Sequence, residues 1–320
     1  MAAAFDVISS FIGYLVRSLD EESSFLAFGM PPDLLLKLRK DIAETISLTI
    51  EYLRDRWDAS VAGASGLHPS ARTGTAATSE GTRLTLTWDS IKDAVTADPL
   101  ILAGIRALAI WIREDENENL RNESAGIMDM LVELYKTSNV EKLDFRYPVL
   151  LALEGILVTE EGVEAFLGQD GWKVVFDDLE QVLQNISSQP ASPNSSNEAA
   201  RGLEIVRVLL AVVDSPSTSS PREEWMEGIK TTASMKLPPV IPAPIILEFH
   251  ISMLQLSTAL LSKAAGGMQK RYVTSSAALS GLSKQLEDIV KRMDDKAEAT
   301  EFLELLEDVF LNLENLRFHN

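Results

Sequence analysis

Apolar residues recur at every third or fourth position over most of this chain, which is the spacing of one buried face on an α-helix. Residues 98–135 (DPLILAGIRALAIWIREDENENLRNESAGIMDMLVELY) give the clearest case, because two such helices flank a short acidic turn. Asp98 stands where an N-cap is expected, and Pro99 follows at the first helical position. Each helix must bury its apolar side against a neighbour. The segment therefore predicts one unit of a stacked helical array.

The first twenty residues also predict a packing helix, because apolar residues return there at helical spacing. They do not read as a signal peptide, since a basic start is missing and Asp6 interrupts the apolar run. Other helices follow along the chain. We expect them at about 33–59, 99–113, 117–136, 160–168, 172–186, 199–213, 222–234, 245–264, 275–293 and 298–316, with one more from 146.

Residues 160–186 combine a short helix that ends at Gly168, a glycine turn and a longer helix that starts at Trp172. Many armadillo-type units have this order of elements. Apolar patterns recur with a period of roughly 35 to 50 residues but without a strict sequence repeat, as in armadillo and HEAT arrays. The pattern predicts an all-α fold, an armadillo/HEAT-like α-solenoid of helical hairpins.

Composition divides the predicted array into segments. Residues 62–86 are rich in Gly, Ala, Ser and Thr, and they hold too few large apolar side chains to offset the entropy of ordering. We predict a disordered insertion there and a flexible linker at 187–198. The helical segments are then an N-terminal hairpin at 1–61, armadillo-like repeats at 87–186 and C-terminal repeats at 199–320.

Net charge limits the class of partner. Asp and Glu number 48 against 29 Lys and Arg, which gives a net charge of −19. Nucleic-acid binding requires clustered cations, and we find no basic stripe. A basic protein segment would be attracted, although the acid can also act only to keep the chain soluble. No apolar run reaches the roughly 18 residues of a membrane span. A chain of this size without cysteine fits the cytoplasm, or the nucleus, best.

Catalytic and cofactor motifs are not found in the sequence. The three histidines, His68, His250 and His319, are too far apart to form a metal cluster by local spacing, and His250 reads as a core residue. Phosphate loops, nucleophile elbows and calcium loops are not present either. We therefore expect no enzyme activity, no catalytic or metal-ligating residue and no cofactor.

Five residues are candidates for partner binding. Trp88 and Trp225 each stand near a helix start after a flexible segment, where an aromatic residue can anchor a partner or close the core. Glu301, Glu304 and Asp308 lie on the acidic side of the last predicted helix. That side is either a solvated surface or a docking strip for a basic partner.

The segment 98–135 resembles the neurochondrin family. The resemblance rests on Leu102–Leu108, on Trp111–Asp115, on Asn119–Glu123 and on Met128–Leu131, and it extends to the helix at 34–57. It covers about 80 of the 320 residues. It implies an armadillo-like, non-enzymatic protein of the cytosol that acts as an adaptor for other proteins. Family members are typically longer, so the resemblance also implies a shortened form or a C-terminal portion of a larger array.

The function expected from these observations is a protein–protein interaction scaffold or adaptor that holds partner segments on a superhelical surface. An acidic solenoid that acts as a chaperone or transport factor for one basic client is the alternative. The adaptor predicts several partners with weak salt dependence, whereas the chaperone predicts one basic client bound in a salt-sensitive way. The sequence leaves the oligomeric state open.

Overall fold

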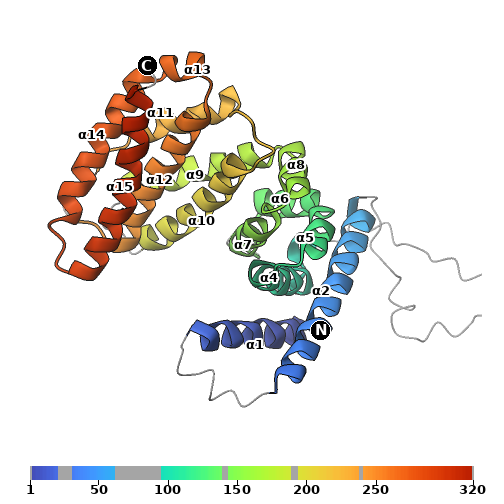
Figure 1. Ribbon diagram of the computed structural model, residues 1–320. Helices are drawn as coiled ribbons and strands as arrows, with labels where there is room; N and C mark the ends of the chain where they lie inside the picture. The colour runs from blue at the N-terminus through green and yellow to red at the C-terminus, as the bar shows by residue number, and fades with distance from the viewer. Residues whose placement is uncertain are drawn as a thin grey trace, which may run out of the picture. The chain divides into compact units, whose positions relative to one another are not determined.

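The computed structural model describes residues 2–20, 31–61, 95–138, 143–188, 194–237 and 241–318. Within these ranges the chain forms helices and no strand (Figure 1). It divides into two compact units, unit 1 with residues 1–165 and unit 2 with residues 166–320. The predicted fold class, an all-α solenoid of helical hairpins, is confirmed.

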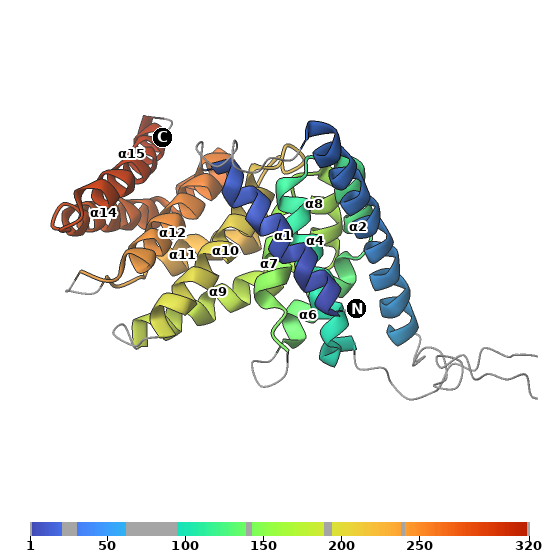
Figure 2. The same cartoon turned by 90° about the horizontal axis from the view of Figure 1, so that it is seen from below.

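Unit 1 consists of two layers of helices. In one layer α4 packs between α1 and α7; in the other, α2 and α5 pack against these helices (Figures 1 and 2). The elements are α1 (Ala2–Asp20), α2 (Pro32–Val61), the short 3-10 helix η1 (Val95–Ala97), α4 (Pro99–Glu114), α5 (Glu118–Ala125), α6 (Met128–Thr137) and α7 (Arg146–Ile156). The helix α8 (Glu160–Gly168) crosses the boundary between the two units.

The start of α4 follows the sequence prediction. The Asp98 carboxylate accepts a hydrogen bond from the backbone N–H of Leu100 at 2.9 Å, and Pro99 occupies the first turn. Ile101, Ile105 and Leu108 are fully buried. This central position of α4 explains why its sequence is almost continuously apolar.

The long helix α2 buries a narrow apolar stripe of Ile42, Ile46, Ile50 and Leu53. Polar contacts hold its flanks against the rest of unit 1. The Trp57 indole N–H donates to Asp129 at 2.7 Å. Leu34 and Leu36, in its first turns, remain 49% and 64% exposed. The middle of α2 is therefore a core element, whereas its N-terminal turns are not.

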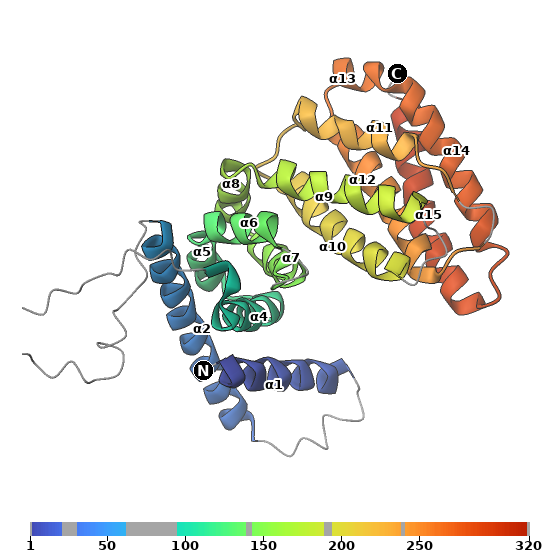
Figure 3. The same cartoon turned by 180° about the vertical axis from the view of Figure 1, so that it is seen from behind.

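Unit 2 repeats the two-layer arrangement. The helix α12 packs between α10 and α15, while α9 packs on α10, and α11 and α14 pack on α12 (Figure 3). The elements are α9 (Gly171–Ser188), α10 (Asn194–Asp214), the 3-10 helix η2 (Glu223–Met226), α11 (Glu227–Ala233), α12 (Pro244–Lys263), α13 (Gly266–Arg271), α14 (Val273–Val290) and α15 (Lys296–Phe318).

Among the described helices, α12 bears on the expectation that the chain has no membrane span. It is long and apolar enough to cross a membrane by length and composition alone. However, 67% of its apolar stretch is buried inside the protein. Contacts with helices on several sides, including α10 and α15, explain the apolar composition. A position in the core of unit 2 accounts for α12 without a membrane.

One predicted helix of unit 1 is interrupted, whereas α8 ends at Gly168 as predicted. The expected helix at 117–136 is broken after α5, because the Arg54 guanidinium of α2 lies against Gly126 and donates to the Glu123 carbonyl at 3.1 Å. In the turn between α8 and α9 the left-handed residue is Asp170, with φ 54°, and not a glycine. Gly171 is required there for another reason, since a Cβ would lie 2.4 Å from the Phe166 ring.

Two further boundaries concern the predicted linkers. The helix expected at 199–213 begins at Asn194, so α10 takes in residues assigned to the flexible linker. Ser195 and Ala199 are buried, which favours the longer helix. The short α13 was not expected from the sequence. The predicted insertion at 62–86 lies outside the described residues, and the division into helical segments stays a prediction.

Candidate functional site

The outer side of α15 carries an uncompensated acidic surface. Glu301, Glu304 and Asp308 are exposed and follow one another at the three- and four-residue spacing of a single helix face. Within the described ranges, no cation forms an ion pair with these three carboxylates or with Glu307. Like charges at this spacing repel one another, so the surface favours the approach of a cation.

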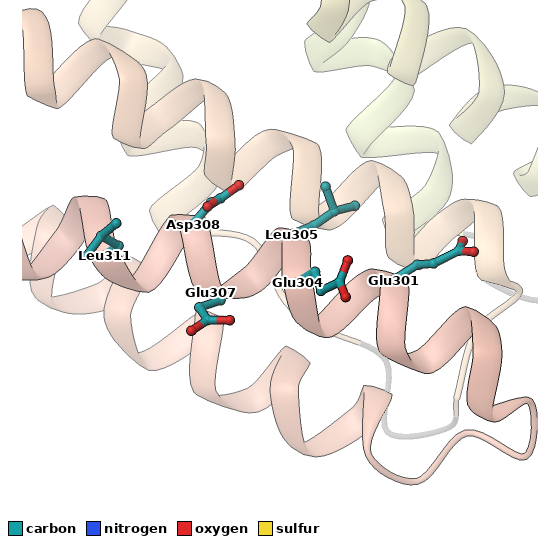
Figure 4. Close-up of a pocket in the computed structure, with 6 residues that line it drawn as sticks. All are labelled: Glu301, Glu304, Leu305, Glu307, Asp308 and Leu311. Carbon is teal, nitrogen blue, oxygen red and sulfur yellow. The ribbon is translucent and has the colours of Figure 1, made fainter.

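Two leucine side chains lie among the acidic residues of this surface. Leu305 is half-buried between the carboxylates, and Leu311 is 57% exposed one turn beyond Asp308. Together with the four acidic residues they line a shallow hollow of about 690 Å³ (Figure 4). We call this surface the α15 hollow, and it is lined by Glu301, Glu304, Leu305, Glu307, Asp308 and Leu311.

The opposite side of α15 holds the helix in place, as the sequence pattern indicated. Phe302, Leu306, Val309 and Leu313 are buried against α12 and α14. Because packing fixes this side, the carboxylates of the α15 hollow are presented from a rigid helix. Leu311 falls outside the buried stripe. That position off the apolar period is the sequence signal that could have identified it as a surface residue.

Trp225 does not lie at the surface. Its side chain is 1% exposed and stacks on Trp172, with 4.3 Å between the ring centroids and 16° between the planes. The Arg222 guanidinium lies over the ring, 5.7 Å from its centroid. Of the two alternatives for Trp225, partner anchor or core residue, the structure has the core residue, because the indole fills the core between η2 and α9. Trp88 lies outside the described residues.

A second hollow of about 390 Å³ lies in unit 2, along α9 and the end of α11. Within this hollow the Thr231 hydroxyl donates a hydrogen bond to the Glu180 carboxylate at 3.1 Å. Its side chains mix hydroxyl, amide, apolar and charged groups, and no sequence motif marks them. They are Glu180, Leu183, Gln184, Ser187, Thr231, Ser234, Met235 and Lys236.

His250 is the buried titratable group of α12. Its side chain is 3% exposed and lies beside Phe249. Burial lowers the pKa of His250 to about 4, so the imidazole is neutral at neutral pH. Among the described residues, no group of three His, Asp or Glu side chains lies close enough to hold a metal ion. His68 and His319 lie outside that part of the chain. The core position expected for His250 is confirmed.

A sequence model of the neurochondrin family matches residues 1–235. An uncharacterized protein of the fission yeast Schizosaccharomyces pombe is 25% identical over 168 residues, which are 52% of this chain and 25% of the yeast protein. The match thus spans about a quarter of that relative's length. No solved structure matches the chain. The resemblance to the neurochondrin family is confirmed over most of the described helices.

Proposed function

Because the chain belongs to the neurochondrin family, we propose that it is a protein–protein interaction scaffold or adaptor, and that one of its docking surfaces is the α15 hollow. Membership of this family supports a non-enzymatic function exerted through the surface. We also propose that the protein acts in the cytoplasm or the nucleus, because a chain of this size without cysteine fits these compartments best.

The observation that carries the proposal is the set of carboxylates in the α15 hollow, which form no ion pair with any cation of the described residues. A partner helix with Lys or Arg on its flanks meets Glu301, Glu304 and Asp308, while an apolar side chain on its inner face covers Leu305 and Leu311. Pairing removes the repulsion between the acidic residues. Burial of the two leucines adds a contribution that salt does not screen. The partner is therefore a basic amphipathic segment.

A labelled 18-residue helix of Leu and Lys tests the site by fluorescence anisotropy. The test variant is Glu301→Gln/Glu304→Gln/Asp308→Asn. Its matched control is Glu160→Gln/Glu161→Gln/Glu164→Gln, which removes three exposed charges from α8 and leaves the same net charge. We expect binding to the full-length protein to weaken about tenfold in the test variant only, as for a lost set of rim charges at an interface. Equal weakening in both variants would show attraction to net charge and refute the site.

The alternative, a chaperone or transport factor for one basic client, rests on the same acidic surface. A pull-down from native lysate with washes at low and high salt separates the two functions. Several partners that remain at high salt support the adaptor. One highly basic client that is lost only at high salt supports the chaperone. In both cases the variant with substitutions at Glu301, Glu304 and Asp308 must lose the partner, while the control variant with substitutions in α8 keeps it.

A further inference from the structure

Unit 1 also has an exposed surface, on the layer that contains α4 and α7. Its residues are basic and apolar, unlike the acidic residues of the α15 hollow. In α4, Arg106 and Arg113 are exposed and Ile110 is half-buried, and the three lie on one face at four- and three-residue spacing. Pro99 and Glu114, at the two ends of the helix, are exposed as well. On α7, Tyr147 is 55% exposed. Val158 is 64% exposed in the turn that follows α7. We call these five residues, Arg106, Ile110, Arg113, Tyr147 and Val158, the α4–α7 strip.

The two halves of the strip lie side by side because α4 and α7 are in direct backbone contact. A Cβ on Gly155 would lie 2.2 Å from Ile112 Cγ2 and 3.0 Å from the Ile112 backbone. Only glycine permits this approach. In the other layer, α2 packs on α4 and α5 packs on α7 (Figure 1).

The composition of the α4–α7 strip is that of an interface centre. Tyr and Arg are the residues most enriched where partners bind tightly, and apolar neighbours exclude water around them. Two of the large apolar side chains that remain exposed in the described residues, Tyr147 and Val158, belong to it.

The charged residues of the α4–α7 strip indicate which kind of segment binds there. Arg113 has Glu114 at 3.6 Å, and Glu154 lies half-buried on the same side of α7. Arg106 is exposed and forms no ion pair within the described ranges, so it is the cation free to bind. A carboxylate on the partner would pair with its guanidinium in a bidentate manner. The apolar side chains of the strip require an apolar face beside that carboxylate.

We infer that the α4–α7 strip is a second docking surface, which binds a short amphipathic segment with an apolar face and an acidic residue opposite Arg106. The inference rests on the proposed scaffold function but not on the α15 hollow. The two surfaces select partners of opposite charge. A chain with both can hold an acidic and a basic segment at the same time.

A displayed library of random 16-residue peptides tests the inference. The full-length protein is the bait, and its Arg106→Glu variant is used for counter-selection. We expect the enriched peptides to share apolar residues at helical spacing with Asp or Glu beside them. No enrichment over the variant, or enrichment of peptides without carboxylates, would overturn the inference.

The best peptide is then synthesised, labelled and titrated against variants. We expect Arg106→Glu and Tyr147→Ala each to weaken binding about tenfold or more, as for an interface anchor. Lys173→Glu is the control for charge, since Lys173 is an exposed cation on α9. Leu48→Ala is the control for exposed apolar area, since Leu48 is 60% exposed and belongs to neither proposed surface. Circular dichroism confirms that all variants are folded.

Equal effects of Lys173→Glu and Arg106→Glu would refute the strip as the site. The basic Leu/Lys helix serves as an independent readout in the same assay. If it binds normally while no acidic peptide does, the α4–α7 strip fails and the α15 hollow stands. If the acidic peptide binds and the basic helix does not, the α15 hollow fails and the α4–α7 strip stands.

Discussion

Trp172 and Trp225 stack on each other, with their ring centroids 4.3 Å apart, although 53 positions separate them in the chain. Trp172 is the second residue of α9, and Trp225 belongs to η2. Both side chains are buried, at 4% and 1% exposure. The pair joins the first turn of α9 to the segment that leads into α11, and it thereby fixes one end of unit 2.

Replacement of Trp225 by alanine should destabilise unit 2 strongly. The change removes a buried aromatic ring and leaves a cavity beside Trp172, which costs about 3–5 kcal/mol for a large core side chain. Urea unfolding followed by circular dichroism measures the loss. Trp225→Phe keeps part of the stacking and should lose clearly less. A loss below about 1 kcal/mol in Trp225→Ala would mean that the indole is not a core residue.

The buried position of Trp225 shows what the sequence predicted and what it did not. Its place after a Ser- and Pro-rich segment permits both an exposed anchor and a core residue. The choice depends on Trp172, which no local pattern pairs with it. Helices with a strong apolar period, such as α4 and α15, were predicted nearly to their ends, because their own residues determine the buried side.

Breaks and starts of helices were harder to predict when a distant residue decides them. The break at Gly126 depends on Arg54 from α2, and the early start of α10 depends on the burial of Ser195. In the α15 hollow the three candidate carboxylates were predicted on the correct side of the helix. The α4–α7 strip was not predicted, because its residues come from two helices whose contact depends on Gly155.

Substitution of Gly155 by alanine tests the contact between α4 and α7. The added methyl group meets both the side chain and the backbone of Ile112, so the helices must separate. We expect a loss of about 1–3 kcal/mol, as for an overpacked core. Gly281→Ala is the matched control, because a Cβ at that position in α14 meets nothing within 4 Å.

The two alanine variants should have opposite signs. Gly281→Ala should stabilise the protein by about 0.5–1 kcal/mol, since alanine loses less backbone entropy in a helix than glycine. Thermal unfolding of both variants is the measurement. Equal or greater stability of Gly155→Ala would show that α4 and α7 do not make the contact described.

Arg39 ties the N-terminal turns of α2 to the end of α4. Its guanidinium lies 2.5 Å from the Asp115 carboxylate, and this hydrogen bond raises the pKa of Arg39. The Asp115 side chain is only 4% exposed. Arg39→Ala leaves that carboxylate buried without its cation, which should cost about 1–3 kcal/mol.

Lys40→Ala is the control for Arg39→Ala, because Lys40 is the exposed neighbour on the same helix. It should change stability very little. Hydrogen exchange adds a local readout, since the amides of α2 should exchange faster in Arg39→Ala than in Lys40→Ala. Similar exchange in the two variants would show that the ion pair does not hold α2 in place.

His250 makes the stability of unit 2 depend on pH. Burial lowers the pKa of His250 from 6.5 in the unfolded chain to about 4 in the folded one. Between these values the unfolded chain binds more protons, so the contribution of the neutral imidazole is complete above pH 6.5 and is lost as the pH falls towards 4. From pH 7.5 to pH 5.5 this linkage should remove about 1.4 kcal/mol.

The variant His250→Leu isolates that contribution. Leucine fills a similar volume and does not titrate, so the carboxylates alone determine the pH dependence that remains. Urea unfolding of both proteins at pH 7.5 and 5.5 gives the difference between their losses, which is independent of any change in absolute stability. We expect the original protein to lose about 1.4 kcal/mol more than the variant over this range. Equal losses would place His250 in contact with water, at an ordinary pKa, and would contradict its position in the core of α12.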